Sequence, residues 1–335
     1  MATYKEIRGT HVLSVTSDPP SPVNGQMWYN STDKVMKGFT SNPVGSWATG
    51  ANMNTARRYP RGAGTQTAAL AFGGVIDTPE TQYNNTESYN GTSWTEVNNL
   101  NTARHSLGGC GTNYTAALFA GGYSGTYQAV NESWNGTSWT EVADLNAAIA
   151  GVAGAGTNTS ALSFAGFNPS NPNGSVTNES WNGSSWTEVG DLNNQRYLAG
   201  GTGASNTAAL CIGGRDSAQT PDEIANTELW NGSAWTEVND LNNKRFVANS
   251  SRQSSTSALH FAGYDSAMRA YTEEWNGTSW TETTDLSAVK ADIGGAGGGS
   301  TSAIAFGGRT PPNNPSTTTE EFTSPTTSTV TFTVS

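Results

Sequence analysis

The chain has 335 residues, of which 34% are hydrophobic, 10% aromatic and 13% charged, with 39 glycines and a formal net charge of −11. We expect no nucleic-acid partner, because affinity for phosphates comes mainly from clustered Lys and Arg. We also expect neither membrane insertion nor a secretory route, because no apolar run approaches about 18 residues and residues 1–17 lack the basic-then-apolar order of a signal.

Residues 1–44 lie outside the repeated pattern that fills the rest of the chain. They contain the Pro-rich run D-P-P-S-P at 18–22 and then G-Q-M-W-Y-N-S-T-D at 25–33, which continues to Phe39. Clusters of Asn, Ser, Thr and Asp between apolar-bearing segments mark turns. The stretch 25–39 therefore predicts a short hairpin, and we expect residues 1–44 to form an N-terminal attachment arm.

From residue 45 to 335 one pattern recurs six times, which predicts a single second domain. Its most regular feature is a tryptophan every 45 to 49 residues: Trp47, Trp94, Trp139, Trp186, Trp235 and Trp280. A period in this range is typical of a small set of repeat architectures, and four-stranded propeller blades are foremost among them.

Each copy predicts four strands. A Gly-rich stretch, such as R-G-A-G-T at 61–65, predicts an innermost strand, where large side chains would clash. The run T-[AS]-A-[LI]-x-x-[GA]-G follows and is small and apolar throughout, as in a strand covered on both faces. The motif E-x-W-N-G-x-x-W predicts an outer hairpin, since Asn-Gly accepts the positive φ of a tight turn. The six runs lie at 67–74, 115–122, 159–166, 207–214, 256–263 and 301–308.

The two ends of the array are complementary. Trp47 occupies an outer-strand position with no repeat before it, whereas Glu320-Glu-Phe322 matches the third strand of a repeat and has no Trp after it. We expect the strand around Trp47 to complete the sixth repeat. An alternative is that residues 329–334, which alternate like a strand, close that repeat or extend its edge.

These motifs resemble the kelch type of β-propeller, whose repeat has a strand ending in Gly-Gly, then an aromatic, then a Trp. The resemblance covers roughly residues 45–325, and Ala165-Gly166 and Ala262-Gly263 depart mildly from the Gly-Gly pair. It implies an all-β, six-bladed propeller with four-stranded antiparallel blades. The intervening aromatics are Tyr89, Trp134, Trp181, Trp230, Trp275 and Phe322.

The opening G-Q-M-W-Y-N-S-T-D, combined with repeats rich in N-G-T-S-W, resembles bacteriophage virion proteins, notably tail fibre and related appendage proteins of marine phages. The resemblance implies a non-enzymatic virion protein that is assembled in the host cytoplasm. It further implies that the arm binds other virion proteins, that the protein is a homo-oligomer in the virion, and that the propeller meets host-surface glycan or protein. The alternative is a soluble kelch-type interaction module.

Charged and aromatic residues that occur in every repeat are interpreted as architecture. A base at Arg57, Arg104, Arg196, Arg245 and Lys290, broken by Ile149, accompanies an acid at Glu87, Glu132, Glu179, Glu228, Glu273 and Glu320. We expect ion pairs that fix strand register, rather than a cationic ring at the channel mouth for an anionic sugar. We likewise expect the Trp pairs to pack between blades, rather than to serve as platforms for sugar rings.

Catalytic and metal chemistry find little support in the sequence. Some kelch propellers are copper oxidases, but such a site needs converging His and Tyr, and the chain has only His11, His105 and His260. No G-x-S-x-G, nucleotide-binding loop or H-E-x-x-H is present, and Cys110 and Cys211 make no metal-ligand spacing. We expect no catalytic residue, no metal and no cofactor.

The parts that differ between repeats are the loops after each run, at 75–86, 123–131, 167–178, 215–227, 264–272 and 309–319. They join the same two strands of each repeat and so emerge on one face, and loops on a rigid scaffold commonly carry binding sites. The alternative is unselected drift. The candidate ligand-binding residues are Tyr123, Tyr127, Phe167, Arg215, Asp216, Tyr264, Arg269, Tyr271 and Arg309.

Overall fold

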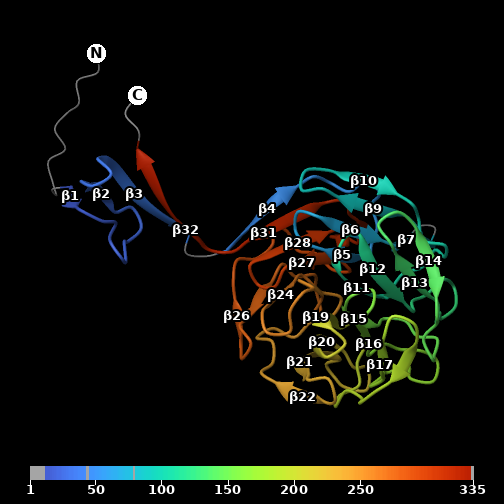
Figure 1. Cartoon of the computed structure of the whole chain (residues 1–335). Helices are drawn as coiled ribbons and strands as arrows, with labels where there is room; N and C mark the ends of the chain where they lie inside the picture. The colour runs from blue at the N-terminus through green and yellow to red at the C-terminus, as the bar shows by residue number, and fades with distance from the viewer. Residues whose placement is uncertain (1–11, 43–44, 78–79, 333–335) are drawn as a thin grey trace. The chain divides into compact units, whose positions relative to one another are not determined.

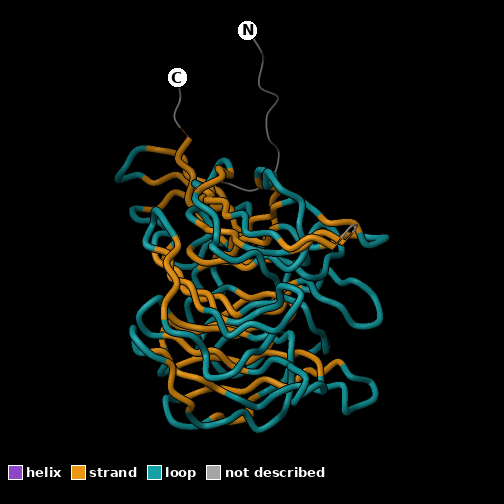
Figure 2. The backbone as a smooth tube through the Cα atoms, turned by 90° about the vertical axis from the view of Figure 1, so that its right-hand side faces the viewer, coloured by secondary structure: helices purple, strands orange, loops and turns teal. Residues whose placement is uncertain are grey.

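A computed structural model of the chain describes residues 12–42, 45–77 and 80–332. These residues form strands and loops throughout, with no helix among them (Figure 2). No helix in this part of the chain is therefore long and apolar enough to cross a membrane. The predicted all-β class is confirmed, and the fold is propeller-like, with many four-stranded antiparallel sheets.

The chain divides into two compact units, Met1–Gly45 with Pro325–Ser335, and Ser46–Ser324. In the first unit, β1 (Leu13–Val15), β2 (Met27–Asn30), β3 (Val35–Asn42) and β32 (Thr326–Phe332) form one sheet in that order. The hairpin expected at 25–39 corresponds to β2 and β3. The second domain was expected to run to residue 335, but β32 pairs with β3, which moves its end to Ser324.

Asp18 holds the first unit together from outside the sheet. Its Oδ1 accepts hydrogen bonds from Trp28 Nε1 at 3.0 Å and Asn30 Nδ2 at 2.9 Å, and Lys37 Nζ lies 2.9 Å from Oδ2. Donors to a carboxylate favour its charged form. The bonds from Asn30, Lys37 and Trp28 accordingly lower the pKa of Asp18 to about 2.

The second unit contains six four-stranded antiparallel sheets, here named A to F (Figure 1). From the first strand to the last, sheet A contains β5 (Arg61–Gly64), β6 (Ala69–Phe72), β9 (Thr86–Tyr89) and β10 (Trp94–Val97), and sheet B contains β11 (Gly108–Asn113), β12 (Ala116–Ala120), β13 (Asn131–Trp134) and β14 (Trp139–Val142). Sheet C contains β15 (Ala153–Gly156), β16 (Ala161–Phe164), β17 (Asn178–Trp181) and β18 (Trp186–Glu188), and sheet D contains β19 (Gly200–Ser205), β20 (Ala208–Arg215), β21 (Glu223–Trp230) and β22 (Trp235–Val238). Sheet E contains β23 (Asn249–Ser250), β24 (Ala258–Phe261), β25 (Thr272–Trp275) and β26 (Trp280–Glu282), and sheet F contains β27 (Gly294–Gly297), β28 (Ser302–Phe306), β31 (Thr319–Thr323) and β4 (Ser46–Gly50). Two short hairpins, β7 (Val75–Asp77) with β8 (Glu80–Gln82) and β29 (Arg309–Thr310) with β30 (Asn314–Pro315), lie in the loops of A and F.

The first strands of the six sheets contact one another in cyclic order, from A through F and back to A. They surround a narrow central space, here called the central channel, in which residues of sheets A to E line a cavity of about 10 Å³, and their glycines permit the close approach. A Cβ added to Gly154 would lie 2.9 Å from the carbonyl oxygen of Gly109 in the neighbouring sheet, and one added to Gly62 would lie 2.4 Å from that of Gly295. The Gly-rich innermost strand that the sequence predicts is therefore a steric requirement of this packing.

Sheet F is assembled from both ends of the second unit. Strand β4 pairs antiparallel with β31, with Trp47 opposite Phe322. The Trp47 ring lies 5.1 Å from Phe261 and 5.3 Å from Phe322, and its Nε1 donates to Thr272 Oγ1 of sheet E at 3.1 Å. The alternative partner, the C-terminal strand, pairs with β3 instead.

The outer tryptophans join neighbouring sheets. Trp139 of sheet B lies 5.3 Å from Trp134 in its own sheet and 5.1 Å from Phe72 of sheet A, measured between ring centroids, and its Nε1 donates to Thr86 of sheet A at 3.0 Å. Trp94 makes the equivalent bond to Thr319 of sheet F. Burying such a side chain contributes about 2–3 kcal/mol. The expectation that these residues pack between sheets is confirmed.

Candidate functional site

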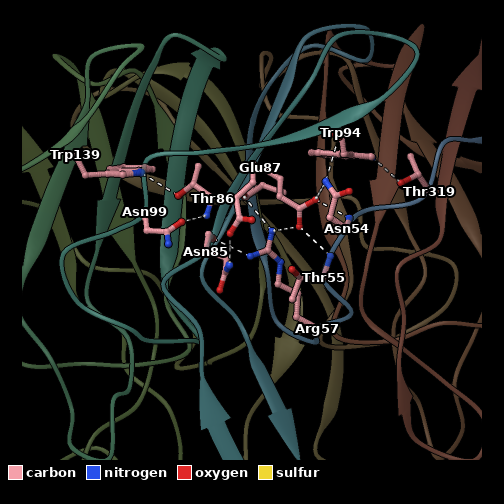
Figure 3. A network of polar contacts seen from close by, with 12 residues as sticks. Asn54, Thr55, Arg57, Asn85, Thr86, Glu87, Trp94, Asn99, Trp139 and Thr319 are labelled. Carbon is pink, nitrogen blue, oxygen red and sulfur yellow. Dashed lines mark hydrogen bonds and ion pairs between the residues drawn. The ribbon is translucent and has the colours of Figure 1, made fainter.

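In sheet A the repeated acid and base form a buried network that ties the sheet to the segment entering it (Figure 3). In sheet A, Arg57 Nη2 lies 3.0 Å from Glu87 Oε1, and both side chains are fully buried. The other carboxylate oxygen accepts from the backbone N–H of Asn54 at 2.7 Å and from its Nδ2 at 3.0 Å. Arg57 Nη1 also donates to the carbonyl of Asn85 at 2.8 Å. One carboxylate thus positions both its own sheet and the linker from the preceding outer strand.

The same pairing recurs in four further sheets and fails in one. The pairs are Arg104–Glu132, Arg196–Glu228, Arg245–Glu273 and Lys290–Glu320. In sheet C the base is replaced by Ile149, and in the described chain Glu179 has no cationic partner; burial raises its pKa. The interpretation as structural ion pairs is confirmed, and the alternative cationic ring is wrong, because these side chains are buried inside the sheets.

A second set of side chains gathers where the six sheets meet on the loop face. The residue after each repeated base forms a backbone bridge with the first residue of the variable loop in the same sheet. These bridges are Arg58–Val75, His105–Tyr123, Ala150–Phe167, Tyr197–Arg215, Phe246–Tyr264 and Ala291–Arg309. They hold the first loop residue beside the residue that follows the repeated base in every sheet.

The next residue along the chain links neighbouring sheets through the backbone. The N–H of Gly151 donates to the carbonyl of Ser106, Leu198 to Gly151, Val247 to Leu198, Asp292 to Val247 and Tyr59 to Asp292, at 2.6–3.1 Å. All six of these residues have positive φ, between 49° and 66°, which is uncommon outside glycine. This chain of bonds follows the cyclic order of the sheets and holds the adjoining side chains around one end of the channel.

Those side chains form a closed circuit of contacts that we call the mouth ring. Its members, in order, are Tyr59, His105, Tyr123, Tyr127, Phe167, Tyr197, Arg215, Phe246, Tyr264, Arg309, Asp292 and Arg58. Six of the nine residues selected from the sequence belong to it: Tyr123, Tyr127, Phe167, Arg215, Tyr264 and Arg309. The others were missed because they follow the repeated base, outside the variable loops.

One half of the mouth ring is aromatic. Tyr127 lies 5.5 Å from Tyr123 and 5.7 Å from Phe167, and Phe167 lies 4.8 Å from Tyr197, between ring centroids. The ring of His105 stacks on Tyr59 at 5.7 Å. Stacked and edge-to-face ring pairs are favourable beyond the area they bury, so this half is a preformed, largely apolar surface.

The other half of the mouth ring combines cations with aromatic rings. The Arg215 guanidinium lies 5.2 Å from the centroid of Phe246, and Arg309 lies 5.4 Å from that of Tyr264. Arg309 and Arg58 share the carboxylate of Asp292, at 2.8 and 3.3 Å. Cation–π contacts and a shared carboxylate hold these arginines in place, and Arg309 and Arg58 are only partly buried.

A pocket of about 280 Å³ opens against the aromatic half. It is lined by Glu80, His105, Ser106, Tyr123, Tyr127 and Phe167. The Glu80 side chain is 60% exposed, and its Oε1 lies 3.8 Å from His105 Nε2. The pocket therefore offers aromatic faces beside a carboxylate and an imidazole, which is the mixture of apolar walls and few polar groups that small-molecule sites use.

The remaining candidates lie outside the mouth ring. Asp216 is buried, and its carboxylate accepts from Gln195 Nε2 at 2.9 Å, from the N–H of Ala218 at 3.0 Å and from Gln219 Nε2 at 2.7 Å. These bonds order its own loop and hold the carboxylate away from the mouth ring's circuit of contacts. Arg269 pairs with Asp265 and lies 5.5 Å from the centroid of Tyr271, as a separate pair.

The residues that sequence reasoning missed are Arg58, Tyr59, His105, Tyr197, Phe246, Asp292 and, in the pocket, Glu80. One signal was available for most of them, because the two positions after each repeated base vary as much as the loops do.

Among the described residues, no group of three or more His, Cys, Asp or Glu side chains could hold a metal ion. No family model matches the chain, and no curated protein matches it either.

Proposed function

We propose that the chain is a six-bladed kelch-type β-propeller of a bacteriophage virion, of the tail fibre or appendage type, that binds a host-surface saccharide at the mouth ring and is not an enzyme. Sheets A to F are its six blades. The observation that carries the binding role is the pocket of about 280 Å³ beside Tyr123, Tyr127 and Phe167. This volume is near the lower end of the range for ligand sites, about 300–1,000 Å³, and suits one small ring.

The chemistry of the pocket favours a saccharide. Aromatic faces pack against the C–H faces of a sugar ring, while the Glu80 carboxylate and the tyrosine hydroxyls can bond its hydroxyl groups. The hydrogen-bond acceptor at Glu80 is exposed and lies beside the apolar wall formed by Tyr123, Tyr127 and Phe167. A flat protein epitope, in contrast, would leave a pocket of this shape unfilled.

The first unit supports the attachment role proposed for the N-terminal arm. Among the described residues, eight large hydrophobic side chains are exposed, and six of them belong to this unit. Such a concentration is characteristic of a surface that contacts a partner. We propose that it binds other virion proteins, including further copies of this chain. The six residues are Val12, Leu13, Val23, Met27, Tyr29 and Phe332.

Glycan-array binding with matched variants tests the saccharide role. We expect wild-type protein to bind a limited set of glycans and Tyr127→Ala to bind them about tenfold more weakly, equivalent to roughly 1.4 kcal/mol. Tyr271→Ala, which removes a loop-face aromatic outside the pocket, is the control and should bind as the wild type does. Absence of glycan binding, together with capture of a protein partner that Tyr127→Ala abolishes, would favour the soluble interaction module instead.

A further inference from the structure

Two arginines interrupt the ring of small residues around the central channel. Arg61 pairs with Phe72, and at the same place in the other sheets stand Gly108, Ala153, Gly200, Asn249 and Gly294. Arg252, three residues after Asn249, stands where the other first strands have Gly64, Gly111, Gly156, Gly203 and Gly297. Because each departure occurs in one repeat only, neither is required by the architecture that the repeats share.

Both arginines extend into the channel and reach other sheets. Arg252 Nε donates to the carbonyl of Gly295 in sheet F at 3.1 Å, and Nη1 donates to that of Gly109 in sheet B at 2.8 Å. Sheet B lies three places from sheet E in the cyclic order, so Arg252 spans the channel. Arg61 Nε donates to the carbonyl of Leu107 at 2.6 Å.

Neither buried cation is neutralised in the way that the repeated bases are. Arg61 is 7% exposed and Arg252 5%, and in the described chain neither forms an ion pair, whereas Arg57 pairs with Glu87. The carboxylate that acts on Arg61 is Asp292, which already pairs with Arg58 and Arg309. A buried charge without a counter-charge is costly.

Burial acts on both groups in the expected direction. It lowers the pKa of Arg61 to about 10 and, together with the charge of Arg61, lowers that of Arg252 to about 9. Both groups remain cationic at neutral pH, so the channel holds two positive charges that form no ion pair with a carboxylate of the described residues.

The two side chains line one cavity of about 10 Å³, together with glycines of sheets B, C and D. This volume holds one water-sized particle. We propose that the cavity is a binding site for a single chloride ion, held between Arg61 and Arg252. A halide ion, which is somewhat larger than a water molecule, balances buried positive charge, which water does not, and the much larger sulfate or gluconate anions exceed the space.

The test compares thermal unfolding of the full chain in sodium chloride and in sodium gluconate at equal ionic strength. Chloride should raise the melting temperature of the wild type by about 2 °C per tenfold increase above its Kd, and gluconate should not. Arg61→Gly introduces the residue of three other repeats and Arg252→Gly that of all five, and both should abolish the difference between the two salts. Arg269→Ala removes a surface arginine and should retain it.

Diffraction from wild-type crystals soaked in sodium bromide gives a second readout that does not depend on variants folding. An anomalous peak between Arg61 and Arg252 is expected. Equal melting temperatures in the two salts, a chloride effect that survives both glycine substitutions, or the absence of a bromide peak in the cavity would each overturn the proposal.

Discussion

The same substitution should have very different effects on stability in two neighbouring sheets. Glu132 and Glu179 occupy equivalent positions in sheets B and C, but Glu132 lies 2.9 Å from Arg104 whereas Ile149 replaces the base near Glu179. Glu132→Gln leaves a fully buried guanidinium without its counter-charge, which costs about 3–5 kcal/mol. Glu179→Gln removes a buried carboxylate that has no cation, so we expect a change near zero or a gain of up to about 1 kcal/mol.

The dependence on pH distinguishes this reasoning from a general effect of substitution. Burial raises the pKa of Glu179 above its ordinary value of 4.5. The folded state therefore binds a proton more readily than the unfolded state, and wild-type stability falls as pH rises from 4.5 through the folded pKa. The advantage of Glu179→Gln should be present at pH 8 and disappear near pH 4.

Urea unfolding followed by tryptophan fluorescence measures both variants, with the slope of the transition as a check that the folded state is unchanged. The expected result is a large loss for Glu132→Gln and none for Glu179→Gln at pH 8. Equal losses for the two variants, or a benefit of Glu179→Gln that grows as pH falls, would refute the argument from unbalanced charge.

Three further changes test the packing of the sheets. Trp139→Ala should destabilise the chain by about 3–5 kcal/mol in urea unfolding, while Trp139→Phe, which keeps a ring against Phe72, should cost less. Gly62→Ala should lower the melting temperature, because its Cβ would lie 2.4 Å from a carbonyl oxygen, whereas Gly298→Ala, whose Cβ meets no atom closer than 3.4 Å, should be tolerated. A chain that starts at residue 45 should unfold cooperatively in calorimetry, and one that starts at residue 51, without β4, should not.

The repeated pattern made the all-β class and the four strands of each repeat predictable from the sequence. The period, the Asn-Gly turns and the small-residue strands each follow from the local geometry of a repeat. The close packing of Gly154 against Gly109 shows why the first strand of each repeat needs small residues. The pairing of the first and last strands of the array could be predicted as well, because Trp47 and Phe322 belong to the two halves of one motif.

The mouth ring was only partly predictable. Tyr123 and Tyr127 lie in a variable loop, but Tyr59 and His105 lie beside the repeated base. The backbone bridges within each sheet and the backbone bonds between neighbouring sheets bring the two groups together. The role of Asp216 could not be read from the sequence, because a charged loop residue looks the same there whether it faces a ligand or organises its own loop. The placement of β32 depends on pairing with β3, which is remote in sequence.

Immunogold electron microscopy of phage particles, purified from the culture that produces the protein and stained with antibody against residues 47–324, tests the proposed virion role most directly. The account predicts gold on a tail, fibre or other appendage, with the label displaced outward from the site of attachment. Particles without label, from lysates in which the protein is abundant and free, would contradict it.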